Sequence, residues 1–200
     1  MKKILILIIL AFTCTGCYDY KEINDLAIIS AIGVDYDNEK YIITLELLND
    51  QLDKNSSKIT SYTKIGSGDT LTSAIENAAD KLSKQPLFNH IKIMILSDNI
   101  IQNKFDNIID LFLRNTYFRE NFYVVATDNK PDDILKNITE ENPVASNAIT
   151  SLLENMKYSS NTAIIKQFDE IIEEITTFGR DTCFSNISLK NKEFLVNGMV

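Results

Sequence analysis

The sequence predicts an α/β (α+β) protein built on a mixed β-sheet with packed helices. Two apolar, β-favouring segments stand close together near the N-terminus, at residues 25–34 and 41–48, with the turn-rich DYDNEK between them. Helical stripes of apolar residues then alternate with short apolar strands over residues 70–137. Because strands separated by helices need crossover connections, we expect parallel central strands, to which an N-terminal antiparallel hairpin is added.

A third strand and the first helix follow this hairpin. Residues 49–57 are polar and predict a loop, and residues 58–65 (KITSYTKI) alternate as an exposed strand. GSGD then breaks the chain, with Asp69 as the predicted N-cap of a helix. Apolar residues recur at helical spacing over residues 70–84, and Pro86 ends this segment.

Two β-α units come next. Residues 91–96 (IKIMIL) and 122–126 (FYVVA) are short apolar runs that predict buried strands. Asp98 is the predicted cap of a helix over residues 99–114. Pro131 opens a short helix in PDDILKN, because its fixed φ suits the first helical turn.

The last third of the chain predicts a helical pair and one more strand. Apolar residues recur at helical spacing over residues 145–156 and again over residues 168–175. Residues 192–200 (KEFLVNGMV) have the pattern of a strand. We expect residues 25–190 to form one globular domain and residues 191–200 to begin a further domain.

The start of the chain has the pattern of a secretion signal with a lipid attachment site. A basic start, Lys2 and Lys3, precedes ILILIILAF, which is shorter than the roughly 20 apolar residues that span a bilayer. CTGC resembles the bacterial lipobox, whose cysteine receives a diacylglyceryl group and becomes the new N-terminus. We therefore predict a lipoprotein signal peptide over residues 1–16, cleavage after Gly16 and lipidation of Cys17. The alternative is an ordinary signal peptide cut near Gly16, with Cys17 left as a free or disulfide-bonded thiol.

A diacylglyceryl anchor would hold an acidic domain outside the cytoplasmic membrane. Two acyl chains hold a protein stably at a bilayer, whereas one chain holds it only marginally. Loss of Lys2 and Lys3 with the signal leaves 184 residues with 18 basic and 28 acidic side chains, a net charge of −10. This balance disfavours nucleic acid as a partner, and it disfavours direct adhesion to anionic lipid.

The residue inventory argues against an enzyme. His90 is the only histidine, so a His-based zinc site is not available, and no Gly-x-Ser-x-Gly segment supplies the nucleophile of a triad. We interpret His90 as a structural, hydrogen-bonding residue. Cys183 is the one thiol left once Cys14 is removed and Cys17 is lipidated, and we interpret it as a part-buried apolar residue. We predict no catalytic site, no metal site and no cofactor.

Several segments together resemble a known family. GCYDYKEINDLAIISAIGVD resembles the opening of the C-subunit lipoproteins of bacterial spore germinant receptors, which is Cys-Trp-Asp-x-x-Glu-Ile-x-Asp-Leu followed by Ile-Gly-x-Asp. Tyr18 stands where Trp is usual. LFNHIKIMILSDNI, DLFLRNTYFRENFYVVA and SLLENMKYSSNTAIIKQFDEIIEEITTFGRD resemble later segments of the family, in the same order. The positions that match the opening are Cys17, Asp19, Glu22, Ile23, Asp25, Leu26, Ile32, Gly33 and Asp35.

This resemblance implies a non-enzymatic subunit of a nutrient receptor complex in the spore inner membrane. The protein would be lipid-anchored on the extracytoplasmic side, with integral membrane A- and B-type subunits as partners. The complex would respond to small nutrients and start germination. Family members continue past a segment like FLVNGMV, so the resemblance also implies a longer protein.

The segment closest to the bilayer is the first candidate for a partner surface. Residues 17–24 are the predicted membrane-proximal tether, and confinement to the membrane raises the effective concentration of partners there. The predicted partner-facing residues are Tyr18, Asp19, Glu22, Ile23 and Asp25. The alternative is a plain tether that leads into the first strand.

Two other classes of protein share the anchor. A solute-binding lipoprotein of a membrane transporter also has α/β content, but it usually has two similar lobes, for which 184 residues are few. A lipid-anchored envelope hydrolase is disfavoured by the single histidine and by the lack of a motif.

Overall fold

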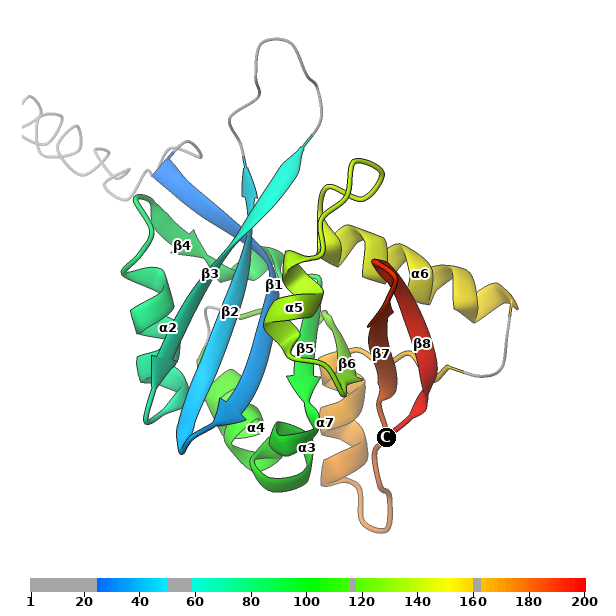
Figure 1. Cartoon of the computed structure of the whole chain (residues 1–200). Coiled ribbons are helices and arrows are strands. Elements are labelled where there is room, and N and C mark those ends of the chain that lie inside the picture. Colours follow the sequence, from blue (N-terminus) through cyan, green and yellow to red (C-terminus); the bar gives the residue numbers. More distant parts are fainter. Residues whose placement is uncertain (1–24, 50–58, 116–117, 160–162) are drawn as a thin grey trace, which may run out of the picture.

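A computed structural model describes residues 25–49, 59–115, 118–159 and 163–200 (Figure 1). The predicted mixed α/β class is confirmed, because one eight-stranded sheet carries helices on both faces. The strands are β1 (Leu26–Asp37), β2 (Lys40–Asn49), β3 (Thr60–Gly68), β4 (Gln85–Leu87), β5 (Ile93–Ser97), β6 (Tyr123–Thr127), β7 (Ser185–Lys190) and β8 (Glu193–Met199). Their order across the sheet is β3-β2-β1-β5-β6-β7-β8, and β4 pairs with β1 off this path.

The sheet has a parallel centre between two antiparallel hairpins. β1, β5, β6 and β7 pair in parallel, as the crossover pattern predicts. The expected N-terminal hairpin is confirmed, and its two-residue turn has positive φ at Asn38 (50°) and Glu39 (59°). β7 and β8 form a second hairpin, which turns at Asn191 (52°) and Lys192 (67°). Two successive positive φ values match the right-handed twist of paired strands.

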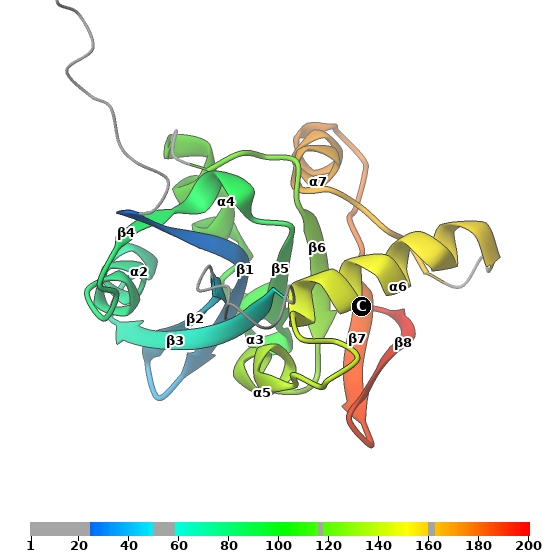
Figure 2. The same ribbon diagram turned by 90° about the horizontal axis from the view of Figure 1, so that it is seen from above.

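Helices cover both faces of the sheet and divide the core into two parts. The helices are α2 (Leu71–Ala79), α3 (Asp98–Asn103), α4 (Phe105–Arg114), α5 (Pro131–Lys136), α6 (Ala145–Ser159), α7 (Phe168–Thr176) and the 3-10 turn η2 (Phe88–His90). One part of the core takes Met94 and Leu96 of β5 with α2, α3, α4 and α7, and the other takes Ile93 and Ile95 with α5 and α6. Side chains alternate along a strand, so β5 contributes to both parts. Figure 2 shows α4 and α7 on one side of the central strands and α5 on the other.

The helix boundaries differ from the prediction at two places. The predicted helix over residues 99–114 is two helices, because the backbone leaves the helical region at Lys104 (φ −139°). Asp98 is the first residue of α3, and Ser97 holds the N-cap position without a capping hydrogen bond. The cap of α2 is Thr70 rather than Asp69: Thr70 Oγ1 accepts a hydrogen bond from Ser73 N, and Ser73 Oγ accepts one from Thr70 N.

Strand boundaries also differ. The GSG segment expected to break the chain lies inside β3, which continues to Gly68. Pro86, expected to end a helix, lies within β4, and α2 ends at Ala79. β4 and β7 were not predicted.

The C-terminal third contains the two expected helices and the expected strand. α6 and α7 pack on opposite faces of the sheet. Residues 191–200, where we expect a further domain to begin, contain the hairpin turn and β8, which pairs with β7. Among the described residues, no helix is long and apolar enough to cross a membrane.

Candidate functional site

The predicted partner-facing segment meets the described fold at Asp25. This residue is exposed and directly precedes β1. The lipidation and cleavage residues and the other predicted contact residues lie outside the described residues, namely Gly16, Cys17, Tyr18, Asp19, Glu22 and Ile23. The edge of the sheet at which Asp25 stands is therefore the described part of the candidate site.

We call this edge the amino edge, because the parallel strands β1, β5 and β6 begin there (Figure 1). Backbone hydrogen bonds connect the starts of these strands: Lys92 N donates to Ser30 O at 2.9 Å, and Tyr123 N donates to Lys92 O at 2.9 Å. β4 also lies at this edge, because it pairs in parallel with the first three residues of β1. The amino edge is thus a fixed surface onto which the N-terminal segment leads.

A cavity of about 700 Å³ lies at the amino edge, between the strand starts and α6. Its lining carries three basic side chains, His90, Lys92 and Arg119, and all three are exposed. Lys92 Nζ donates to Asn147 Oδ1 at 2.7 Å, which joins the cavity to α6. Glu154 is the one carboxylate among the described residues of the lining. The cavity is suited to anionic or polar groups, in contrast to the acidic chain as a whole.

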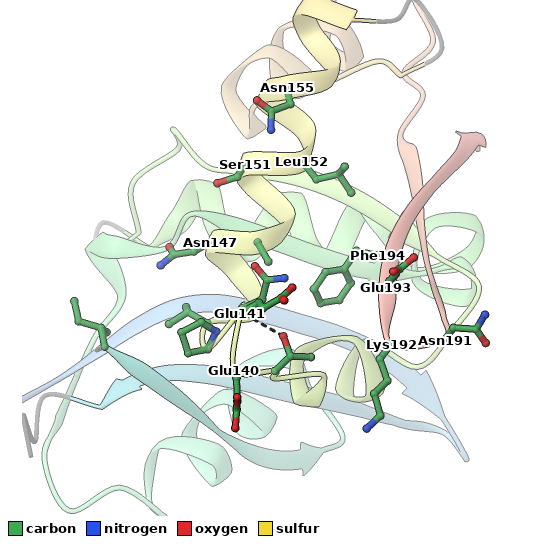
Figure 3. A pocket seen from close by; sticks show the side chains of 16 residues that line it. Glu140, Glu141, Asn147, Ser151, Leu152, Asn155, Asn191, Lys192, Glu193 and Phe194 are labelled. Carbon is green, nitrogen blue, oxygen red and sulfur yellow. Dashed lines mark hydrogen bonds between the residues drawn. The ribbon is translucent and has the colours of Figure 1, made fainter. Parts of the chain in front are cut away.

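A second cavity, of about 790 Å³, opens on the other side of α6. Figure 3 shows its walls: α6 with Asn147, Ser151 and Leu152, and the β7–β8 hairpin with Phe194 of β8. The loop that precedes α6 closes one end and contributes Glu141. Amides, carboxylates and a few apolar groups line this cavity, so it is a mixed, open groove.

A buried carboxylate positions the helix that separates the two cavities. Glu46 of β2 has no exposed surface, and its Oε1 accepts hydrogen bonds from Ala145 N (2.7 Å) and Ser61 Oγ (2.8 Å). Its Oε2 accepts from Ser146 N (3.1 Å) and Ser30 Oγ (2.8 Å). The first N–H groups of a helix have no partner within the helix, and a carboxylate there also meets the positive end of the helix dipole. Glu46 therefore attaches the start of α6 to three strands at once.

A β-bulge in β1 supplies one of these hydrogen bonds. Ile29 pairs with Leu47 and Ala31 with Glu46, so Ser30 is an extra residue between two pairs. A bulge redirects a side chain that regular alternation would send to the other face. Ser30 can thus reach Glu46 on the face that α6 covers.

The opposite edge, where β5 and β6 end, carries two neighbouring carboxyl groups. Asp98 follows β5 and Asp128 follows β6, and the last strand residues Ser97 and Thr127 are register partners. Burial raises the pKa of Asp98, and the negative charge and hydrogen bonding of Asp128 raise the pKa further. We call this the carboxyl edge.

The remaining reactive side chains form no catalytic arrangement in the described part of the chain. His90 is exposed at the end of η2, and Cys183 is half-buried with its Sγ 3.8 Å from Lys166 Nζ. Lys166 Nζ also pairs with Glu174 Oε2 at 2.5 Å, and this hydrogen bond lowers the pKa of Glu174. No group of three or more His, Cys, Asp or Glu side chains in the described ranges could hold a metal ion.

Sequence reasoning missed Glu46, although its position gave a signal. Glu46 is a lone acidic residue in the apolar strand segment YIITLELL, and buried charges are tolerated only with partners. Its partners come from β1, β3 and α6, up to 100 positions away, so the pattern alone does not identify them. The two cavities were not predicted either, because they depend on where α6 lies.

Comparison with known proteins gives a consistent result. A family model described as "Spore germination protein N-terminal domain" matches residues 19–189. The chain is 29% identical over 205 residues to spore germination protein A3 of Bacillus subtilis (strain 168), which covers 98% of this chain and 53% of that protein. It is 30% identical over 149 residues to spore germination protein KC of the same strain, covering 70% of this chain and 37% of that protein.

A third relative comes from another species. Spore germination protein GerQC of Bacillus cereus is 23% identical over 209 residues, which covers 100% of this chain and 55% of that protein. This chain therefore spans about half the length, or less, of these curated relatives. No solved structure matches the chain.

Proposed function

The chain belongs to the family of the spore germination protein N-terminal domain, and from this membership we propose that it is a lipid-anchored subunit of a receptor that starts spore germination. The observation that carries the proposal is the extent of the family match. It begins at residue 19, two positions after the lipobox cysteine, and runs to residue 189. A diacylglyceryl group on Cys17 would therefore stand directly before the family domain.

We further propose that the anchor places this domain on the extracytoplasmic side of the spore inner membrane, beside integral membrane A- and B-type subunits. A tether of residues 17–24 spans at most about 27 Å, so the amino edge stays close to the bilayer. Confinement to the membrane raises the effective concentration of membrane partners, and a small interface then suffices. Tyr18, Asp19, Glu22, Ile23 and Asp25 are the proposed first contacts, with the amino edge behind them.

The proposed role is assembly and not catalysis. The single histidine is exposed on a short 3-10 turn, and the most buried carboxylate, Glu46, is occupied by four hydrogen bonds that hold α6. In this role the domain supplies a shaped surface, and the response to nutrients is a property of the whole complex.

Replacement of the lipidated cysteine tests the proposal. In spores that carry Cys17→Ala as the only copy, we expect the protein to leave the membrane fraction and the germination response to be lost. Cys183→Ala is the matched control, because it removes a half-buried thiol far from the signal and should preserve both properties. Mass spectrometry of the unsubstituted protein should find a diacylglyceryl group on Cys17.

Two results would contradict the proposal. One is an unmodified Cys17 amino terminus on a protein found in the soluble fraction. The other is a Cys17→Ala strain that germinates normally with its protein still in the membrane. Tight binding of amino acids or sugars by the chain itself, measured by calorimetry, would favour the solute-binding lipoprotein instead.

A further inference from the structure

The cavity at the amino edge collects basic side chains from separate segments of the chain. His90 is the last residue of η2, Lys92 lies between η2 and β5, and Arg119 lies in the segment before β6. Among the lining residues that the structure describes, Glu154 is the one acid. Lys92 and Arg119 carry permanent positive charges, so positive charge is in excess in the cavity even where His90 is neutral.

This excess reverses the charge balance of the molecule. The sequence has 20 Lys and Arg residues against 28 Asp and Glu residues. Asp25 and Glu120 are also exposed near this edge, but neither of them lines the cavity. A concave surface that carries one sign of charge concentrates ions of the opposite sign, so the cavity favours an anion locally.

Hydrogen-bonded backbone holds the basic side chains on one wall of the cavity. Lys92 N donates to Ser30 O, and Lys92 O accepts from Tyr123 N, both at 2.9 Å. Beside Arg119, Glu120 O accepts a hydrogen bond from Asp169 N at 3.2 Å. Side chains that start from fixed backbone lose less freedom when a ligand binds.

The opposite wall is α6, which supplies uncharged donors. The hydroxyl groups of Thr150 and Ser151 line the cavity from this helix. Asn147 Oδ1 accepts from Lys92 Nζ at 2.7 Å, so the NH₂ group is the part of this amide that can donate to a ligand. One more cation lies close by, because Lys157 Nζ is 5.3 Å from the ring centroid of Tyr123, which also lines the cavity.

We propose that this cavity binds a phosphate group, carried either by a phospholipid headgroup or by a free phosphate ester. A guanidinium group binds phosphate oxygens in a two-pronged geometry, and an ammonium group adds a point charge, so Arg119 and Lys92 provide both modes. The hydroxyl and amide groups of α6 then face the remaining oxygens. A volume of about 700 Å³ accommodates a phosphate together with the group that carries it.

The lipid source of the phosphate rests on the proposed function, because the tether would keep the amino edge near the bilayer. The net charge of the chain disfavours adhesion to a whole anionic surface, whereas a cavity captures a single headgroup. The phosphate chemistry itself does not need the anchor, and its test uses no membrane. A failure to bind phosphate would therefore leave the prediction for Cys17 untouched, and an unmodified Cys17 would leave phosphate binding untouched.

Titration of the whole chain with sodium phosphate, in a maltoside detergent that contains no phosphate, tests the proposal. His90 is the only histidine, so isotope-labelled histidine gives a single reporter inside the cavity by NMR. We expect the His90 ring signals to shift and saturate in phosphate. Sodium chloride at the same ionic strength should not reproduce this saturable shift.

Charge variants of the lining sharpen the result. Lys92→Gln and Arg119→Gln should each weaken phosphate binding by about two- to fivefold, because each removes one positive charge at an exposed position. Glu154→Gln removes the opposing carboxylate and should tighten binding. Lys40→Gln, at an exposed lysine at the start of β2 and outside the lining, is the matched control and should bind like the parent. All four variants should keep the parent's Tm in chloride, so that a lost response does not reflect misfolding.

Two soluble probes distinguish the sources. Glycerophosphoglycerol is the headgroup of phosphatidylglycerol without acyl chains, and glycerol phosphate is a free monoester. Saturation at a lower concentration of the first supports a lipid headgroup as the ligand, and saturation at a lower concentration of the second supports a soluble phosphate ester. Equal shifts in phosphate and chloride would overturn the proposal. So would Lys92→Gln and Arg119→Gln chains that titrate like the parent, or a Glu154→Gln chain that binds no more tightly.

Discussion

At the scale of single residues, Glu46 does most to determine the shape of the candidate site. A buried carboxylate is tolerated only when its oxygens are hydrogen-bonded, and here each oxygen accepts one hydroxyl and one backbone N–H. Both N–H groups belong to the first turn of α6, whose side chains line both cavities. One side chain in a strand thus fixes the position of a helix that follows it by about a hundred residues.

Replacement of Glu46 by Gln should destabilise the fold although the side-chain volume is preserved. A carboxamide has one acceptor oxygen and one NH₂ group, so at least one N–H of α6 would face a donor. An unsatisfied buried donor costs about 1–3 kcal/mol, and we expect Glu46→Gln to lower the free energy of unfolding by about 2–3 kcal/mol. Urea unfolding followed by circular dichroism measures this, with Glu154→Gln on the exposed face of α6 as control. A loss no larger than that of the control would show that the network does not hold α6.

At the scale of elements, the sequence pattern predicted strands and helices that have a strong period of their own. β1, β2, β5 and β6 are apolar runs, and α2 and α6 carry clear stripes, so local patterning and tertiary structure agree there. β7 (SNISLK) has little apolar character and exists because β6 and β8 pair with it on either side. The break at Lys104 likewise has no signal in its neighbourhood, since Phe105 continues the apolar stripe.

The carboxyl edge shows that local sequence patterns are limited for sites as they are for elements, because they do not reveal which strands are neighbours. Asp98 and Asp128 each follow a predicted strand, so their placement at a strand end could be expected from the sequence. Their proximity depends on β5 and β6 being neighbours in register, and Asn186, whose Nδ2 donates to Asp128 Oδ1 at 2.8 Å, arrives from the unpredicted β7. Long-range pairing, which a single sequence does not reveal, is what assembles these side chains.

The glycines of β3 have a tertiary role that a chain-break interpretation overlooks. A Cβ atom built on Gly66 would lie 2.2 Å from Ala74 O and 2.3 Å from Ala78 N, both in the backbone of α2. The helix therefore rests directly on the strand at this point, and the exposed Ser67 beside it accepts a hydrogen bond at its carbonyl from Asn77 Nδ2 (2.7 Å). Close contact between backbones explains why small residues occur on both elements.

Gly66→Ala should accordingly push α2 away from β3. Backbone atoms cannot move as a flexible side chain does, so the methyl group shifts the whole helix, and overpacking of this kind costs about 1–3 kcal/mol. Ser67→Ala is the matched control at the next position, where the side chain is exposed and no clash arises. We expect a clear loss of unfolding free energy for the first variant and almost none for the second. Equal values would mean that α2 does not rest on β3 as described.

At the scale of the whole molecule, charge is distributed unevenly between the two edges of the sheet. His90, Lys92 and Arg119 gather at the amino edge, where the chain enters. The carboxyl edge carries six acids at strand and hairpin ends and at the start of α5 (Asp35, Asp37, Asp98, Asp128, Asp132 and Asp133) and four lysines (Lys40, Lys104, Lys130 and Lys136), so acids are in excess there. At the amino edge, Asp25 and Glu154 balance the two permanent cations, Lys92 and Arg119, so an anionic lipid surface repels the carboxyl edge more than the amino edge. The short tether at the amino edge and this charge distribution therefore favour the same orientation, in which the amino edge faces the bilayer and the carboxyl edge points away from it.

This orientation gives a prediction for the anchored protein. β1 is 12 residues long, which corresponds to about 40 Å, so an upright domain holds the β1–β2 turn far from the bilayer. In a Cys183→Ser background, His90→Cys and Asp37→Cys provide single labelling sites at the two edges for an environment-sensitive fluorophore. On acylated protein reconstituted into phosphatidylglycerol-containing vesicles, lipid-borne quenchers should quench the label at position 90 strongly and the label at position 37 weakly.

Removal of the anchor by Cys17→Ala should abolish both signals, and Lys92→Glu with Arg119→Glu should reduce the difference between the sites. Equal quenching at both positions in the acylated parent would mean that the domain lies without a preferred edge toward the membrane, and that the amino edge is not the surface presented to membrane partners.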